Sequence, residues 1–144
     1  MIRPAQETDA PAMAMVLSNW IDETPWMPRL HSRADDLGFC EKLLERAEVW
    51  VADTTAGIGF LARQGESIEA LYLAPSIRRA GWGKALITAI RTDRARLSVW
   101  TFQANKAAIA FYQAVGFHIS DFTDGAGNTE KLPDCYMIWT RETP

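Results

Sequence analysis

The stretch that decides the fold reads LYLAPSIRRAGWGKAL and runs from Leu71 to Leu86. It begins as an apolar strand, passes through a short loop with two glycines, and continues as a helix with one apolar face. The first N–H groups of a helix have no intrahelical partner, and the helix dipole adds partial positive charge at that end. The stretch therefore predicts a strand, a turn and a helix start suited to an anion.

Glycines and cations gather at this helix start. Gly81 and Gly83 would let phosphate oxygens approach the backbone without a Cβ in the way. Arg78, Arg79 and Lys84 place three positive charges within seven residues of a chain whose net charge is −3. These features favour a phosphate-binding turn, and a basic helix start without a ligand is the alternative.

Two other phosphate-binding patterns are excluded here. A Walker A loop requires Ser or Thr after Gly-Lys, where this chain has Ala85. A dinucleotide-binding fingerprint requires Gly or Ala where Leu86 stands. Neither a mononucleotide nor a dinucleotide loop is expected.

A second informative stretch, NKAAIAFYQAVGF, runs from Asn105 to Phe117. Asn105 is a good helix N-cap, and Gly116 suits the position after a helix end. Tyr112 falls on the apolar face of the predicted helix, where a core tyrosine is the plain structural interpretation. Each residue has a structural explanation, but the joint pattern after a strand is harder to obtain by chance.

Outward from these stretches, the pattern predicts a mixed α/β domain spanning residues 1–144. An edge strand at 2–4 precedes a helix from about residue 9, which prolines at 25 and 28 end. Ser32 and Asp35 form a capping box that opens a second helix. The predicted strands then cover 48–53, 57–63, 67–73, 97–102, 117–122 and 136–141, with helices at 81–94 and 106–114.

Composition bounds the function. Hydrophobic residues make up 48% of the 144 residues and charged residues 23%, which is ordinary for a globular domain. The net charge of −3 argues against a nucleic-acid-binding protein, whose surface is normally basic. No apolar run approaches membrane-spanning length and the N-terminus lacks the order of a signal peptide, so no membrane partner and a cytoplasmic location are expected.

The few cysteines and histidines argue against a metal site. Cys40, Cys135, His31 and His118 stand apart, and none of them forms a C-x-x-C or H-x-x-x-H pair. Isolated cysteines in an apolar chain are most often core residues, and a disulfide is not expected.

The two stretches together resemble the GNAT superfamily of N-acetyltransferases. Residues 78–83 have that family's R-x-x-G-x-G form, and residues 105–117 match its N-x-x-A-x-x-F-Y-x-x-x-G-F pattern at every fixed position. Arg79 is a departure, because a glycine is frequent at its position. The resemblance implies a GNAT-like, mainly antiparallel mixed sheet in which strands 67–73 and 97–102 are parallel and splay apart.

The resemblance also implies acetyl-CoA as co-substrate. Its pyrophosphate would lie on the turn at 78–84, and its pantetheine arm between the splayed strands. The residues that would hold it are Leu71, Leu73, Arg78, Arg79, Gly81, Gly83, Lys84 and Asn105.

The implied reaction is direct transfer of the acetyl group to a primary amine in a ternary complex. Expulsion of a thiolate calls for an acid, and Tyr112 would supply the proton. The oxyanion that forms needs a donor, which the Leu73 N–H would provide. For the base, Glu69 is the leading candidate, because it would share an otherwise apolar strand face with Leu71 and Leu73. His31 and a water relay are the alternatives.

The acceptor is an amine-bearing small molecule or peptide that the sequence does not identify. Trp26, Met27 and His31 are candidate acceptor contacts, because the family's early segment often shapes that site. The sequence leaves the oligomeric state open, and a homodimer is one option because dimers are common in the family that the chain resembles. The competing function is a non-catalytic module of the same fold that binds or senses acyl-CoA.

Overall fold

The computed structural model describes residues 1–141, so residues 142–144 of the expected domain lie outside it. Seven strands form one sheet in the order β1-β2-β3-β4-β5-β7-β6. The strands are β1 (Ile2–Pro4), β2 (Glu48–Thr54), β3 (Gly57–Gln64), β4 (Ser67–Leu73), β5 (Arg96–Phe102), β6 (His118–Thr123) and β7 (Asp134–Thr140). The helices are α1 (Ala10–Glu23), α2 (Arg33–Arg46), α3 (Trp82–Arg91) and α4 (Lys106–Ala114), with short 3-10 turns at Glu7–Asp9 and Pro75–Ile77.

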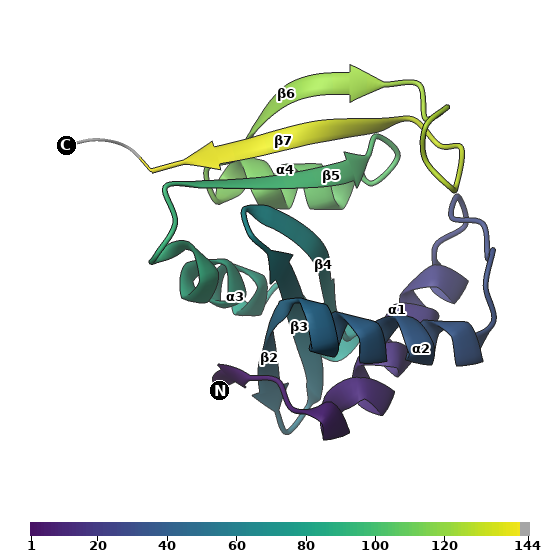
Figure 1. Cartoon of the computed structure of the whole chain (residues 1–144), viewed down its shortest axis with the longest axis vertical. Helices are drawn as coiled ribbons and strands as arrows, with labels where there is room; N and C mark the ends of the chain where they lie inside the picture. Colours follow the sequence, from purple (N-terminus) through teal and green to yellow (C-terminus); the bar gives the residue numbers. More distant parts are fainter. Residues whose placement is uncertain (142–144) are drawn as a thin grey trace.

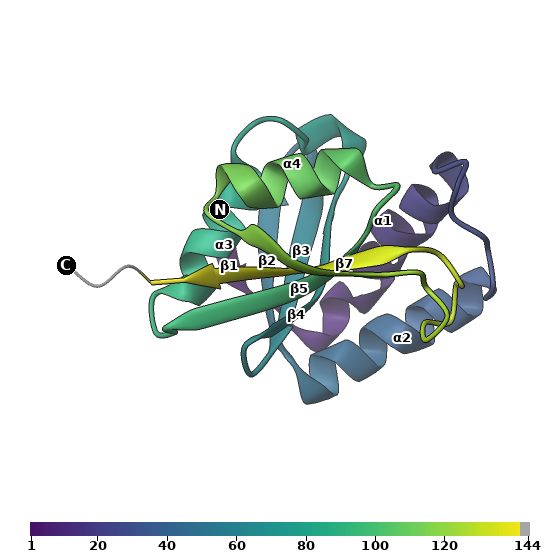
Figure 2. The same cartoon turned by 90° about the horizontal axis from the view of Figure 1, so that it is seen from above.

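Helices cover both faces of the sheet (Figures 1 and 2). Helices α1 and α2 pack on one face of β2, β3 and β4, around a core that includes Met13, Leu43 and Phe60. On the opposite face, α3 and α4 share a second core, in which Leu86 and Tyr112 meet Met137 of β7. The predicted mixed α/β class is confirmed.

Most element boundaries agree with the sequence pattern, but α3 ends earlier than predicted. The helix was expected to reach Arg94 and stops at Arg91. Two arginines from other elements bind the main chain at this end: Arg63 donates to the Ile90 carbonyl at 2.5 Å, and Arg141 donates to the Arg91 and Thr92 carbonyls. Because these donors satisfy carbonyls that another helical turn would have used, the chain is free to leave the helix.

The last two strands are also shifted from the predicted ranges. The strand expected at 117–122 covers His118–Thr123, and the one expected at 136–141 covers Asp134–Thr140. Asp134 pairs with Phe102 of β5 and with Thr123 of β6, so it belongs to the ladder on both sides. The polar character of Asp134 hid this strand start from the hydrophobic pattern.

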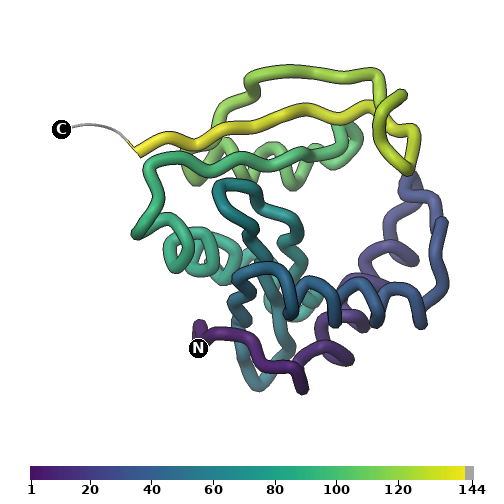
Figure 3. Tube along the Cα trace, in the orientation of Figure 1, coloured from purple at the N-terminus to yellow at the C-terminus, as the bar shows by residue number. Residues whose placement is uncertain are grey.

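The two halves of the sheet separate between β4 and β5 (Figures 1 and 3). These strands are parallel, and they pair only at Ser67 with Ser98 and at Ile68 with Val99. Against β3, the register of β4 shifts so that Arg63 pairs with Ile68 and Ala62 with Ala70, which leaves Glu69 without a partner. Such a bulge bends a strand, and here it lies next to the last β4–β5 pair. The splayed parallel pair is therefore present.

Both cysteines are free and fully buried, as the sequence predicts. Cys40 lies in the core under α1 and α2, and Cys135 lies in the core under α3 and α4. Among residues 1–141, no helix is long and apolar enough to cross a membrane. That same part of the chain contains no group of three or more His, Cys, Asp or Glu side chains placed to hold a metal ion.

Candidate active site

The cleft between β4 and β5 is bordered by main-chain groups that no neighbouring strand satisfies. The Ala74 N–H donates to the Ile58 carbonyl at 2.9 Å, and Gly59 is the ladder partner of Leu73. This pattern makes Gly59 and Leu73 a non-hydrogen-bonded pair, so the main-chain groups of Leu73 point away from β3 and toward β5. By alternation the same holds for Leu71. Because β5 pairs only with the first two residues of β4, these groups face the open cleft.

Beyond β4, the turn into α3 presents free N–H groups. Gly81 is the N-cap of α3, with a φ of +88°, and no side chain caps the helix. The first helical bond runs from the Ala85 N–H to the Gly81 carbonyl. Among the described residues, the N–H groups of residues 79–84 have no backbone acceptor. A cluster of free donors at a helix N-terminus is suited to an anion.

The two glycines of this turn have different structural reasons. A Cβ on Gly81 would meet nothing within 4 Å, so its left-handed backbone is what requires glycine. A Cβ on Gly83 would lie 2.9 Å from the Phe111 ring of α4, so close packing of α3 on α4 requires glycine there. Arg79 also has a left-handed backbone, with a φ of +61°. This conformation explains why a glycine suits the position of Arg79.

The three predicted cations of the turn do not act together. Arg79 and Lys84 are exposed beside the free N–H groups. Arg78 instead extends to the end of α1, where it forms an ion pair with Glu23 at 2.6 Å, and its Nε donates to the Leu73 carbonyl at 3.1 Å. Two of the three predicted cations, Arg79 and Lys84, are therefore without an ion pair among the described residues, and the place of Arg78 at the phosphates stays a prediction. The guanidinium of Arg78 lies over the cleft and occupies a carbonyl that the pantetheine arm was expected to use.

Asn105 and Tyr112 lie on the α4 side of the cleft, as the motif predicts. The Asn105 side-chain oxygen accepts from the Ala108 N–H at 3.1 Å, so this residue caps α4 and leaves its amide NH₂ available. Tyr112 is 6% exposed and lines the same small cavity of about 100 Å³ as Asn105 and Leu71. Burial raises the pKa of the Tyr112 phenol, which keeps it protonated and able to donate.

Thr101 of β5 lines the cleft, although no sequence pattern predicts it there. It is 6% exposed and lines the cleft, and its hydroxyl has no hydrogen-bond partner among the described residues. A buried hydroxyl without a partner is costly, and such groups in native proteins usually have an explanation. No sequence pattern marks Thr101, because it lies in an ordinary strand.

Glu69 lies in the cleft, but its surroundings differ from the prediction. The sequence places it on an apolar face with Leu71 and Leu73, where poor hydration would make its carboxylate a better base. In the structure Glu69 occupies the bulge of β4 and is exposed to solvent. The bulge breaks the alternation on which the prediction rested. Solvent around Glu69 is compatible with a base that acts through water.

A larger cavity of about 610 Å³ lies between α1, α2 and the loop that joins β6 to β7. We call it the α1–α2 cavity. Trp20, Tyr72 and Phe102 line both this cavity and the cleft, so the two spaces meet at these three aromatic side chains. The rings of Trp20 and Tyr72 contact each other, with centroids 5.2 Å apart, and the Phe102 ring contacts Trp26, with centroids 5.9 Å apart.

Two of the three predicted acceptor contacts line the α1–α2 cavity. Met27 and His31 belong to its wall, and Trp26 lies outside it, packed edge-on against Trp20 near Arg78 and Asn105. His31 is exposed, and within residues 1–141 its main-chain carbonyl accepts from Arg29 while its ring has no polar contact. The aromatic residues that connect the cavity to the cleft were not identified from the sequence, because they come from α1, β4 and β5.

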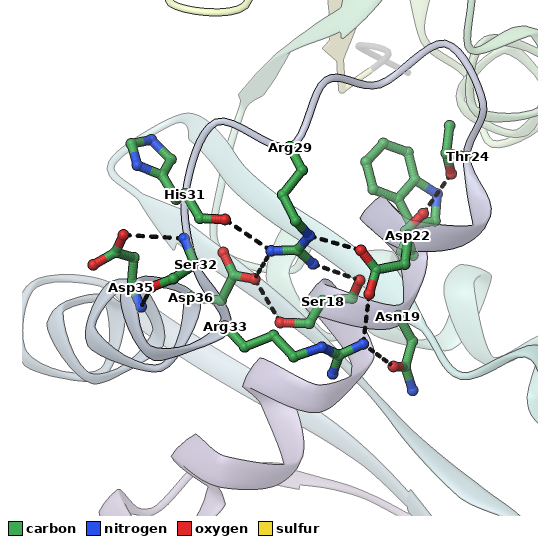
Figure 4. Close-up of polar contacts among 11 residues, drawn as sticks. Ser18, Asn19, Asp22, Thr24, Arg29, His31, Ser32, Arg33, Asp35 and Asp36 are labelled. Atoms are coloured by element: carbon green, nitrogen blue, oxygen red, sulfur yellow. Dashed lines mark hydrogen bonds and ion pairs between the residues drawn. The ribbon is translucent and has the colours of Figure 1, made fainter.

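A polar network fixes the segment between α1 and α2 (Figure 4). Arg29 donates to Asp22 at 2.6 Å, to the buried Asp36 at 3.0 Å and to the Ser18 carbonyl at 2.9 Å. Asp36 also accepts a hydrogen bond from the buried Ser18 hydroxyl. Arg33 donates to the side chains of both Asp22 and Asn19, which lie one turn apart on α1. These contacts hold residues 24–32 in place as a wall of the cavity.

The carboxylates of the α1–α2 cavity differ in their partners. The Asp35 carboxylate accepts from the N–H of Ser32, the N-cap of α2, and the Asp36 carboxylate accepts from Arg29 and Ser18. Glu130, from the β6–β7 loop, forms no hydrogen bond or ion pair with any residue in the described range 1–141. Glu130 and Tyr72 line the same cavity, and burial together with the charge of Glu130 raises the pKa of Tyr72 to about 12. One unneutralised carboxylate therefore borders the aromatic junction.

Comparison with known proteins agrees with this geometry. Residues 45–119 match the family described as the acetyltransferase (GNAT) domain. Peptidyl-lysine N-acetyltransferase YiaC of Escherichia coli (strain K12) is 34% identical over 147 aligned residues, which cover 96% of each chain. The chain therefore belongs to the GNAT acetyltransferase family.

Solved structures share the fold at lower identity. The apo form of YjaB from Escherichia coli superposes with a TM-score of 0.78 at 20% identity, over 96% of each chain. The yncA protein from Salmonella typhimurium, solved with its cofactor acetyl-CoA, gives a TM-score of 0.74 at 17% identity and covers 100% of this chain and 96% of its own.

Membership of this family makes the protein an acetyl-CoA-dependent N-acetyltransferase. The structure fits the co-substrate at three points. Free N–H groups at the start of α3 suit its phosphates, main-chain groups of β4 that no strand pairs suit an extended amide arm, and Thr101 has a hydroxyl without a partner in the described part of the chain. A Cβ at position 81 would leave this turn strained.

Proposed function

We propose that this enzyme transfers the acetyl group of acetyl-CoA to the ε-amino group of a lysine side chain in a peptide or protein. The observation that carries the proposal is the junction between the α1–α2 cavity and the cleft. Trp20, Tyr72 and Phe102 line both spaces, and the free carboxylate of Glu130 lies beside them. A lysine has an apolar stem and a cationic end, and a wall of aromatic rings with one carboxylate suits both parts.

The relatives support this acceptor class. The protein with 34% identity across almost the whole chain is named a peptidyl-lysine N-acetyltransferase. The YjaB protein of Escherichia coli, 23% identical over 121 residues, has the same description. A cavity of about 610 Å³ has room for a lysine side chain and adjoining main chain.

In the proposed reaction the neutral amine attacks the thioester carbonyl carbon, a C–N bond forms, and the C–S bond breaks. The Leu73 N–H, which faces the cleft, would donate to the oxyanion. Tyr112 would give its proton to the departing thiolate and regain one from solvent. Because burial raises the pKa of Tyr112, the phenol is protonated throughout the neutral range and always available as a donor.

The amine must lose a proton, and Glu69 is the proposed base. It lines the cleft together with Tyr112 and Leu71, and it is open to water. A proton could therefore pass from the amine through water to the Glu69 carboxylate. His31 is the weaker candidate, because it lies on the α1–α2 cavity and does not line the cleft.

The test uses purified protein, acetyl-CoA and peptides that carry one lysine and a blocked N-terminus. We expect thiol release together with one acetyl group on the lysine, located by fragmentation mass spectrometry. Peptides with arginine in place of the lysine serve as the control, because they keep the charge and offer no amine. Release of thiol with small amines but with none of the lysine peptides would overturn the proposed acceptor and leave the enzyme class intact.

A further inference from the structure

A second cavity, of about 490 Å³, lies on the other side of Glu130. Strand β5 and the β6–β7 loop form its walls, and we call it the Trp100 cavity. It shares Phe102 and Glu130 with the α1–α2 cavity, so these two residues form a common wall. A ligand in the α1–α2 cavity would therefore have the Trp100 cavity beside it.

The walls of the Trp100 cavity combine aromatic rings with carboxylates. Trp100 is 52% exposed, which is unusual for an indole in the interior of a sheet, and its ring lies 4.8 Å from that of Tyr136. Glu130 and Asp134 supply two carboxylates, and no lysine, arginine or histidine of residues 1–141 lines the cavity. An exposed indole face next to a carboxylate is a suitable site for a cationic side chain.

The two carboxylates have different roles. Asp134 accepts hydrogen bonds from Thr123 and from the Asn128 amide, so it holds the β6–β7 loop onto the sheet. Glu130 has no such contact within the described part of the chain. Its charge remains available to a ligand, and it is the only one of the two that faces both cavities.

The loop that carries Glu130 is built as a fixed wall. The Asn128 amide also donates to the Leu132 carbonyl at 2.7 Å, and Lys131 donates to the Ala126 carbonyl at 2.7 Å. Gly125 is buried against Leu132, and a Cβ there would lie 2.3 Å from the Leu132 carbonyl. The cavity is therefore preformed, and a ligand would not have to order it first.

From this arrangement we propose that the Trp100 cavity binds a basic side chain of the acceptor, an arginine or lysine within two residues of the lysine that is acetylated. This inference rests on the proposed function, because the α1–α2 cavity must hold the reacting lysine. In an extended peptide, side chains two residues apart project to the same side, and neighbours lie 3.2–3.4 Å apart along the chain. Side chains at this spacing can enter two cavities that share one wall.

The experiment measures both binding and turnover with a matched peptide series. Each peptide has one lysine and a blocked N-terminus, with arginine, glutamine or glutamate at one of the four positions within two residues of that lysine. Dissociation constants are measured by calorimetry in the presence of coenzyme A, and kcat/KM is measured with acetyl-CoA. We expect arginine to bind about 5- to 10-fold more tightly than glutamine at one or two of these positions, and less so at high salt.

Two variants and their controls locate the effect. Trp100→Leu and Glu130→Gln should each remove most of the preference for arginine. Phe122→Leu is the control for the first, because Phe122 is an exposed ring on β6 that does not line the cavity. Glu45→Gln is the control for the second, because Glu45 is an exposed carboxylate of α2 outside both cavities. Both controls should keep the preference.

The binding series decides this inference, and turnover decides the proposed function. Equal affinity for the arginine and glutamine peptides in the wild-type protein would overturn the basic-side-chain site, even if lysine is acetylated. A preference that persists in Trp100→Leu and Glu130→Gln would also overturn it. Selective binding of the arginine peptides without acetylation of any lysine would overturn the proposed acceptor and leave the assignment of the Trp100 cavity intact.

Discussion

On the β4–α3 side of the cleft, most groups available to a ligand belong to the main chain: the open edge of β4 and the free N–H groups of residues 79–84, with the exposed Arg79 and Lys84 beside them. On the α1–α2 side they are side chains, brought together from α1, α2, β4, β5 and the β6–β7 loop. The first side depends on backbone conformation and tolerates few sequences, whereas the second can change its lining without changing the fold. This difference suits an enzyme family with one acetyl donor and many acceptors.

The largest effect should come from Tyr112, where the two sides meet. Tyr112→Phe removes the proposed acid and keeps the buried ring that packs against Phe111 and Phe117. We expect kcat to fall by about 10²- to 10³-fold, with the dissociation constant for acetyl-CoA nearly unchanged. Steady-state kinetics and calorimetry check this, and unchanged turnover would remove Tyr112 from the mechanism.

The next largest effect should be a loss of stability, caused by a mutation in the polar network that supports the α1–α2 cavity. Asp36→Ala leaves the buried Ser18 hydroxyl and the Arg29 guanidinium without their shared acceptor, at a cost of about 1–3 kcal/mol in the free energy of unfolding. The KM for peptide should rise, and the KM for acetyl-CoA should not.

The matched control for Asp36 is Asp22→Ala, which removes an exposed partner of the same Arg29. Solvent replaces that contact, so a much smaller loss is expected. Urea unfolding measures the free energy of unfolding of both variants. Equal losses would show that the burial of Asp36 does not determine how much the network stabilises the protein.

The next largest effect should come from a mutation that strains the backbone of the turn before α3. Gly81→Ala adds a methyl group that meets nothing, so its effect comes only from the left-handed conformation, at about 1–2 kcal/mol. If part of that strain is relieved by a shift of the turn, the KM for acetyl-CoA should rise by about tenfold.

Gly65→Ala is the control for Gly81→Ala. Gly65 has a φ of +61°, and its Cβ would also meet nothing, but it lies in the β3–β4 turn at the far end of β4. It should lose similar stability and keep its KM for acetyl-CoA. A tenfold change in that KM for Gly65→Ala would mean that general destabilisation, rather than the turn, causes the effect.

The smallest effect should come from the contact that joins the two sides. Glu23→Gln weakens the ion pair that draws Arg78 over the cleft toward α1. The freed guanidinium could then turn toward the phosphates, and we expect the KM for acetyl-CoA to fall by about 2- to 5-fold at low salt. Glu45→Gln again serves as control, and an unchanged or higher KM in Glu23→Gln would show that the pair does not compete with the co-substrate.

The sequence was a good guide where a role depends on a residue and its close neighbours in the chain. Gly81 could be identified because a left-handed turn before a helix requires glycine, and Asn105 because it caps the helix that follows it. The open edge of β4 could be inferred only through the family resemblance. No local pattern shows that β4 and β5 stop pairing after two residues.

The sequence was a poor guide where a role depends on distant contacts. The prediction for Glu69 assumed a regular strand, and the bulge that exposes this residue is a property of the β3–β4 pairing. Arg78 was assigned to the phosphate turn, but its partner Glu23 lies 55 residues away in the chain. No sequence pattern marks Thr101 or Glu130, because the interest of each residue depends on the side chains that surround it in the folded protein.

By itself, then, the sequence determined the mixed α/β fold, the glycine turn before α3 and the place of Tyr112 on α4, since turns, caps and helix faces follow from neighbouring residues. Only the tertiary structure decided the α1–α2 side of the cleft. Its cavities exist because α1, α2 and the β6–β7 loop pack next to the splayed strands, and that packing is set by contacts between segments far apart in the chain.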